Sequence, residues 1–570
     1  MHTVLVGFDN GTKDYLGRRE ANQKGKNNLA KSLINKWERM KRIRQKTESL
    51  RWEACAYVQH RMDEFSIGKS PVRAVKLYNT SGIEAFETFV NGYHGNLISP
   101  AMRWFSLILF GENYEDVDTI HGANDFLELC ETRMYGEFNK SNFYPMDKLA
   151  TKDAAVQGTS AEFIIDDVER GQCIYDALPP WDFWIDSNSR GRIDTIFYRY
   201  DLTAEQAQER FGDKIPEEIA LDIEQDNGDS EHEFLLAIYP RKSVRDDKGK
   251  ILISTNKPFA AVTYSKSGDC VIDESGYDDF PVAVHIWEPD GTSVYGKGLV
   301  MKYLAELKRL NAMCKDELIA VQKTGRPPWI IHESQKGRFS PDPDARNYIG
   351  NMENMPRILQ TVQDVGWVSN EIVELEGKIK KLFFNDLFNY LMQQNKVLTA
   401  TQVQAIKNEE LVLLSSILGT TQFLKINPIV KRTFTIMVKG KRLPQPPKEL
   451  LRIKDALMKI ELDGPLARNV KAYTMQDGLT SSLEILQTLQ AMQLQNTFDN
   501  VDMDKFARRI LTGAGLPQDV LREIADRERI RVQKQQMIEQ QMQMQQAQAA
   551  SEVARNMGGQ GNLNNAQGAN

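Results

Sequence analysis

The chain has 570 residues, which predicts about four domains. It is 41% hydrophobic and 26% charged, the composition of an ordinary globular protein, and its formal net charge of −6 argues against a strongly basic, sequence-reading nucleic-acid binder. The five cysteines are scattered without a CxxC pair, which argues against a disulfide framework or a zinc site. No apolar run is long enough to span a bilayer and the N-terminus lacks a signal-peptide pattern, so we expect a soluble, intracellular protein.

The N-terminal region predicts a flexible arm over residues 1–27 and then a helix from Asn28 to Arg61. Apolar residues recur there at spacings of three and four, and lysines and arginines cover the rest of the helix surface. Two interpretations stay open: a helix that faces nucleic acid, or a solvated outer face. The second is favoured, because interspersed charges are the usual coat of an amphipathic helix.

The next part of the chain predicts a mixture of helices and strands. Thr80-Ser81-Gly82 should form a turn that caps a helix running through Phe89, and residues 142–194 read as β-rich. Thr203 begins a short helix that ends at Phe211, with Gln206 completing a capping box. Residues 231–284 are again strand-like, with turns at 246–249 and 267–269.

Two long helices are predicted in the second half, over residues 297–323 and 369–393. The first carries a heptad stripe in which only Asn311 is polar, so it should pack along a similar helix. The stripe consists of Val300, Leu304, Leu307, Asn311, Cys314, Leu318 and Val321. The intervening segment is polar and rich in Pro and Gly, with short β-like runs at 329–331 and 358–362.

Further helices are predicted toward the C-terminus. A capping box at Thr399 and Gln402 should open a helix that ends near Gly419, and a helix over 422–438 should bend at Pro428 and stop at Gly440. Helices should follow at 471–495 and 503–511 and from Pro517. The Gln/Met-rich stretch 535–548 is either helical or disordered, and residues 558–570 have a disordered composition.

Motifs for catalysis or cofactor binding are not found. The sequence has no P-loop, no HExxH pair and no GxSxG elbow. Gly296-Lys297-Gly298 is interpreted as a turn that opens a helix, and the aspartates at 166–167 and 342–344 as turn residues rather than metal ligands. His285 is interpreted as a half-buried strand residue. We therefore expect no enzymatic activity, no cofactor and no metal.

Separated segments, in order over roughly residues 50–550, resemble the portal (head-to-tail connector) proteins of short-tailed, podovirus-type bacteriophages. The first group comprises Asn79-Thr80-Ser81-Gly82, Asn96-Leu97-Ile98-Ser99-Pro100 and Arg103-Trp104-Phe105. The central group comprises Pro179-Pro180, Asp182-Phe183, residues 191–195, 202–206 and 210–212, Tyr295-Gly296-Lys297-Gly298, Leu310-Asn311 and Pro327-Pro328. The last group comprises residues 398–403, 464–468 and 515–517, followed by the Gln-rich tail. Leu299, Leu398 and Gln402 depart mildly from the family pattern.

The resemblance implies an α+β, portal-type fold with a mixed α/β wing, two long stem helices, a small β-containing clip and a helical C-terminal crown. The implied boundaries are an arm at 1–27, the wing at 28–296, the first stem helix at 297–324, the clip at 325–367, the second stem helix at 368–393, a return to the wing with the tunnel loop at 394–463, the crown at 464–534 and a partly disordered tail at 535–570.

The resemblance also implies the function. Such proteins form a ring, usually a dodecamer, at one capsid vertex of the virion after assembly in the host cytoplasm. The channel of the ring passes double-stranded genomic DNA without regard to its sequence. Implied partners are terminase, the tail adaptor and the major capsid and scaffolding proteins, and no membrane is involved. Two other classes stay as alternatives: an ATPase or nuclease of genome packaging, which the missing Walker A motif opposes, and a helical scaffold-type protein, which the β-rich half opposes.

Three groups of candidate site residues follow from that architecture. The candidate tunnel loop is Gln393, Gln394, Asn395 and Lys396. The candidate DNA-facing stem lysines are Lys302, Lys308, Lys315, Lys378, Lys380 and Lys381, which either face the channel or pair with Glu306, Asp316 and Glu374. The candidate docking residues of the clip are Trp329, Lys336 and Arg338.

Overall fold

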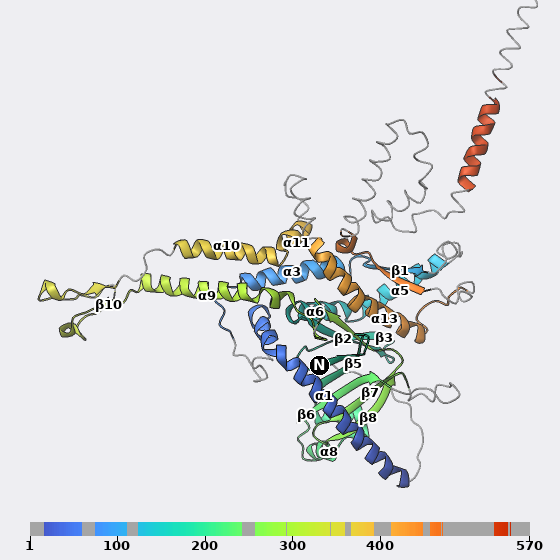
Figure 1. Ribbon diagram of the computed structural model, residues 1–570, viewed down its shortest axis with the longest axis horizontal. Coiled ribbons are helices and arrows are strands. Elements are labelled where there is room, and N and C mark those ends of the chain that lie inside the picture. Colours follow the sequence, from blue (N-terminus) through green and yellow to red (C-terminus); the bar gives the residue numbers. More distant parts are fainter. Residues whose placement is uncertain are drawn as a thin grey trace, which may run out of the picture. The chain divides into compact units, whose positions relative to one another are not determined.

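A computed structural model describes residues 16–59, 75–110, 123–241, 257–359 (except 292 and 343), 366–392, 412–447, 457–470 (except 469), 529–544 and 548. The chain divides into two compact units, Met1–Val470 and Lys471–Asn570. Helices and strands both contribute extensively to the first unit, which confirms the predicted α+β class (Figure 1).

The α-helices that the structure assigns in the first unit differ widely in length. They are α1 (Leu16–Val58), α3 (Ser81–Leu97), α5 (Ala123–Lys140), α6 (Phe143–Gln157), α7 (Ala204–Phe211), α8 (Glu217–Glu224), α9 (Leu299–Gly325), α10 (Gly366–Leu382), α11 (Asn385–Met392) and α13 (Asn427–Lys439). Residues 412–421 are also helical, and a π-helical segment, Gln422–Ile426, joins them to α13.

The strands of the described residues form four antiparallel sheets. The largest has the order β4-β5-β6-β7-β8, the next is β3-β2-β9, and β1-β12 and β10-β11 are two-stranded. The strands are β1 (Phe105–Phe110), β2 (Thr159–Asp167), β3 (Gln172–Leu178), β4 (Phe183–Ser187), β5 (Ile193–Thr203), β6 (Glu231–Pro240), β7 (Phe259–Ser265), β8 (Cys270–Tyr277), β9 (Val282–Ile286), β10 (Trp329–Ile330), β11 (Arg357–Ile358) and β12 (Leu457–Leu462).

The three-stranded sheet separates two hydrophobic cores, because successive side chains of a strand point to opposite faces. Phe163 and Ile165 of β2 join Ile196 and Ile238 of the five-stranded sheet in one core. Ile164, between them in sequence, belongs to the larger core that α3, α6, α9, α10 and α13 share. The sheet therefore lies between the long helices and the five-stranded sheet.

Helix α1 covers the other face of the five-stranded sheet. Leu33 and Met40 are buried there with Phe197 and Leu235, and the Trp37 ring lies edge-on to Trp184 with 5.3 Å between the ring centroids. Most of the apolar face predicted for this helix is therefore covered, although Ile43 at its end is 42% exposed. The helix begins at Leu16, earlier than the predicted start at Asn28, so it extends into the expected arm.

Helix α9 begins where the backbone of two segments comes into close contact. A Cβ atom at Gly298 would lie 2.3 Å from the Val156 carbonyl oxygen, and one at Gly296 would lie 2.7 Å from the carbonyl oxygen of Gly158. Gly158 itself has a φ of 81°, a conformation that glycine adopts readily. The predicted turn that opens a helix is confirmed, and its glycines are required by this close approach.

Several predicted elements are wrong in detail. Residues 143–157 form helix α6 rather than strands, and the helix predicted over 369–393 is divided into α10 and α11. Phe384, at the division, has a φ of 56°, and Phe383 and Phe384 are both buried against α3. One straight helix would not place both rings in that core. Strand β1 and helix α5 were not predicted.

Other predictions are confirmed. Thr203 accepts a hydrogen bond from the backbone of Gln206, whose side chain bonds back to Thr203, so the capping box is present. Gly440 ends α13, as predicted, and Pro428 lies in the first turn of that helix, directly after the π-helical segment.

Some predictions lie outside the described residues. These are the turn at 246–249, the capping box at Thr399 and Gln402, the helices of 471–511 and the segment 558–570. In the second unit, residues 529–544 are helical. Across the described part of the chain, no helix combines the length and the apolar character that crossing a membrane requires.

Candidate functional site

Helices α9 and α10 form an antiparallel pair that lies side by side (Figure 1). Leu307 and Leu310 of α9 are buried in the same core as Leu375 and Ile379 of α10. Ion pairs connect the exposed flanks of the two helices: Arg309 with Glu371 and Lys378 with Glu306, each at 2.5 Å. The pair is therefore held by an apolar seam and bordered by charges, as the heptad pattern predicts.

Asn311, the polar residue of the heptad stripe, ties the pair to the segment before α3. Its side-chain oxygen accepts from the Tyr78 backbone at 2.8 Å, and its nitrogen donates to the Lys76 carbonyl at 3.1 Å.

The neighbouring residues of that segment contact the second helix of the pair. Asn79 and Ser81 each donate to Glu376 Oε1 of α10 at 2.7 Å. The segment 75–81 thus fastens both long helices, and a lone Asn in an apolar stripe was the sequence signal for it.

The outer end of α9 is in a different environment. Ser369 near the start of α10 donates to Glu317, and beyond that point Leu318 and Val321 are 45% and 53% exposed. Trp367 of α10 is 67% exposed. Within one chain, α10 therefore leaves Leu318 and Val321 of the stripe uncovered, and the predicted packing is confirmed only for the part of the stripe up to Cys314.

Residues 326–359 continue this exposed region, called here the outer segment. Strands β10 and β11 pair Trp329 with Ile358, and among the described residues of 326–359 only Pro356 is buried. Exposed apolar side chains include Ile330, Tyr348, Ile349, Met352, Met355 and Leu359. A segment of this size with so little buried surface has no core of its own.

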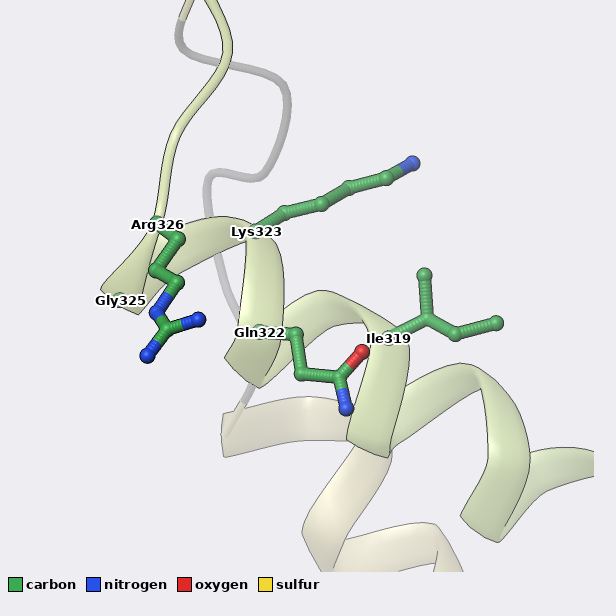
Figure 2. A pocket seen from close by; sticks show the side chains of 5 residues that line it. All are labelled: Ile319, Gln322, Lys323, Gly325 and Arg326. Atoms are coloured by element: carbon green, nitrogen blue, oxygen red, sulfur yellow. The ribbon is translucent and has the colours of Figure 1, made fainter. Parts of the chain in front are cut away.

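An open concavity lies where α9 meets the outer segment (Figure 2). It is lined by Ile319, Gln322, Lys323, Gly325 and Arg326. Figure 2 shows Lys323 extending away from the helix, with Ile319 about one turn earlier. The concavity therefore combines an apolar side chain with two cations and belongs to the same outer surface.

The structure divides the six candidate stem lysines into two groups. Lys302, Lys308 and Lys378 pair with Glu288, Glu53 and Glu306 at 3.4, 2.6 and 2.5 Å. Lys315, Lys380 and Lys381 are exposed, and no carboxylate of the described residues pairs with them.

The docking candidates lie in the outer segment. The Trp329 ring is half-exposed and its centroid is 5.2 Å from that of Phe339. Lys336 and Arg338 are exposed on either side of Gly337, whose φ is 80°. The tunnel-loop candidates Gln393 to Lys396 lie outside the described residues.

Comparisons with known proteins identify the family. The family model described as bacteriophage head to tail connecting protein matches residues 30–521. The chain belongs to this family.

Two curated relatives agree with that assignment. The chain is 25% identical to the portal protein of Salmonella phage epsilon15 over 542 residues, covering 92% of this chain and 94% of the relative. It is 23% identical to the probable portal protein of Bordetella phage BPP-1 over 435 residues, covering 74% and 76%. The predicted family is confirmed, and with it the role of a structural head-to-tail connector at the capsid vertex of the virion.

A buried ionic cluster of the connector was not predicted. Lys425 of the π-helical segment is 2% exposed, and its Nζ lies 2.7 Å from Asp147 Oδ1 of α6 and donates to Thr151 at 2.6 Å. His94 of α3 contacts the other Asp147 oxygen at 3.0 Å. The lysine within the apolar run Phe423-Leu424-Lys425-Ile426 was the available signal.

The electrostatics of this cluster follow from burial and from Lys425. Burial acts to raise the pKa of Asp147, but the charge of Lys425 and the hydrogen bond from His94 outweigh it and hold that pKa at about 2. Burial, and then the charge of Asp147, raise the pKa of Glu162 well above its usual range. Burial, and then the charge of Lys425, lower the pKa of His285 to about 3.

The remaining chemical candidates have structural contacts. His285 is buried rather than half-buried, and its Nε2 lies 3.1 Å from the Thr421 hydroxyl. Asp166 pairs with Arg442 at 2.5 Å, and Asp342 accepts from Ser340 at 2.6 Å. Among the described residues, no group of three His, Cys, Asp or Glu side chains is placed to hold a metal ion.

Proposed function

We propose that copies of this connector assemble into a closed ring, a dodecamer by analogy with its family, and that double-stranded DNA enters and leaves the capsid through the channel of that ring. Residues 28–296 and 394–463 act as the wing, α9 and α10 with α11 as the stem, residues 325–367 as the clip, and residues 464–534 as the crown. The ring has no enzymatic activity of its own.

The observation that supports assembly most directly is the exposed apolar surface of the outer end of α9 and the outer segment. Large contiguous apolar surfaces on a single chain mark places where another protein binds. A second copy of the chain is a suitable occupant, since a ring presents the same surface to the next subunit at every position.

Negative-stain electron microscopy of the purified connector tests this proposal. The expected images show rings with a central hole. Monomers or open filaments, seen at concentrations where the chain is folded, would contradict it.

The channel contacts are assigned to Lys315, Lys380 and Lys381, because their charges are not used in ion pairs within the described chain. Contacts between lysine and phosphate are independent of base sequence and weaken with salt. Such contacts suit double-stranded DNA that must slide through a channel. Replacing the three by glutamine should reduce the amount of DNA packaged in an in vitro reaction, whereas glutamine at the paired Lys302 and Lys308 should have little effect.

The outer segment is proposed to bind terminase during genome packaging and the tail adaptor afterwards, with major capsid and scaffolding proteins as further partners of the ring. Glutamate at Lys336 and Arg338 should impair terminase or adaptor binding in a pull-down more than ring formation. Unchanged binding of both partners would contradict the docking assignment.

A further inference from the structure

Helix α1 carries a charge opposite to that of the rest of the connector. Its sequence contains twelve lysines and arginines against four glutamates, a net charge of +8. Because the whole chain carries −6, the remaining residues carry −14. Such asymmetry within one chain indicates a surface for a polyanion.

Part of this positive charge anchors the helix. Arg39 pairs with Asp186, and the buried Arg44 donates to the Phe183 carbonyl oxygen. The Arg51 guanidinium lies over the Tyr295 ring, 4.7 Å from its centroid. These contacts, with the apolar face on the five-stranded sheet, fix which side of α1 is turned outward.

The outward side presents Lys31, Arg42 and Lys46. At 100° per residue these three fall within about 60° of one another, and at 1.5 Å per residue they span about 22 Å. All three are exposed, and no carboxylate of the described residues pairs with them.

Some surface lysines elsewhere in the connector form ion pairs. Lys214 pairs with Asp273 at 2.7 Å and Lys266 with Glu233 at 3.0 Å. At the α1 face three unpaired cations lie on one side of a single helix, whereas at these two positions an acid lies beside the base.

The other residues of this face suit phosphate oxygens. Asn35, Gln45 and Ser49 are exposed beside the three cations, and Glu38 is the one acid on this face of the described α1 that is exposed. Lys, Arg, Asn, Gln and Ser are the side chains that contact DNA phosphates, whereas protein–protein interfaces are centred on aromatic and apolar anchors. No aromatic side chain lies on this face among the described residues of α1.

We propose that the outward face of α1, defined by Lys31, Arg42 and Lys46, binds the phosphate backbone of double-stranded DNA independently of base sequence. This contact is separate from the stem lysines assigned to the channel. It gives the connector a second contact with duplex DNA, on DNA that is not inside the channel.

Covalently closed circular duplex DNA distinguishes binding at the α1 face from binding in the channel, because a closed circle cannot be threaded into a preformed ring. Binding of this DNA to the full-length connector is measured across a range of salt concentrations. The triple variant K31E/R42E/K46E should bind it about tenfold more weakly or worse. The slope of log affinity against log salt should fall by about 2.7, because each phosphate that is no longer neutralised reduces the slope by about 0.9.

The matched control carries the same change of charge at exposed positions outside α1, K140E/K148E/R190E. It should keep most of the affinity and the salt slope. The melting temperature and electron microscopy of each variant show whether folding and ring assembly are retained. If the triple glutamate variant loses either, the milder K31Q/R42Q/K46Q variant replaces it.

Equal losses in the α1 and control variants would overturn the proposal, because only net charge would then matter. Unchanged DNA binding together with loss of rings in the α1 variant would also overturn it, since the face would be a contact between subunits. Variants of Lys315, Lys380 and Lys381 should leave binding of circular DNA intact, so a failed channel assignment is distinguishable from a failed α1 site.

Discussion

The inner and outer halves of α9 share one apolar stripe but have different surroundings. Leu307 is 4% exposed between α3 and α10, whereas Leu318, eleven residues later on the same stripe, is 45% exposed. A Cβ atom at Gly82 of α3 would lie only 2.7 Å from Leu307, so the inner half is tightly packed. The apolar stripe is the same in both halves of α9. The position of the partner helix decides which half is buried.

This difference separates two kinds of interaction. The packed inner half of α9 and the buried Asp147–Lys425 cluster stabilise the fold of one chain. The outer end of α9 and the outer segment expose apolar surface that one chain leaves uncovered, so their side chains should matter for assembly rather than for folding.

The largest effect is expected in the buried ionic cluster. Lys425→Met should reduce the free energy of unfolding by about 3–5 kcal/mol, because it leaves the Asp147 carboxylate buried without its cation. The double variant D147L/K425M should recover much of that loss in urea denaturation. If the double variant is as unstable as the sum of the single variants, the pair is not the source of the effect.

The stripe of α9 offers a direct test of the comparison. Leu307→Ala should cost about 2–5 kcal/mol of stability in urea denaturation, since it leaves a cavity in a packed core. Leu318→Ala, the matched change on the same stripe, should leave stability of the single chain nearly unchanged and shift the ring population seen by microscopy. Similar stability losses at both positions would show that the two halves are equivalent.

The pH dependence of stability should reflect His285. Its pKa is about 3 in the fold and 6.5 when unfolded, so the unfolded chain binds a proton that the folded chain does not. Stability should therefore fall as the pH falls from 6.5 toward 3, by at most about 1.4 kcal/mol per pH unit from this group. With His285→Gln, the melting temperature should depend less on pH over that window. Glutamine at the exposed His332 should leave this dependence unchanged.

The smallest effect is expected at the charged border of α9 and α10. Lys378→Met removes the exposed pair with Glu306 and should change stability by less than about 1 kcal/mol. A change as large as that for Lys425 would mean that the border, not the seam, holds the two helices together. Matched urea denaturation of both variants makes this comparison.

Local chemistry was predictable from the sequence. The capping box of Thr203 and Gln206 and the turn at Gly296 to Gly298 depend on neighbouring residues, and both are present. The family assignment was also predictable, because it rests on the order of short motifs along the chain. The candidate docking and channel residues follow from that assignment and stay predictions.

Long-range contacts were decided by the tertiary structure alone. The chain divides α10 from α11 at Phe384 because the core around α3 accepts both phenylalanine rings, and periodicity does not report that. Lys425 meets Asp147 across 278 residues of sequence, a pairing that no local pattern encodes. The sequence by itself determined the family, the capped short helix and the apolar faces of the long ones, since these depend on residue type and spacing. Which apolar face is covered, and which charge is paired, depends on what the fold places opposite it.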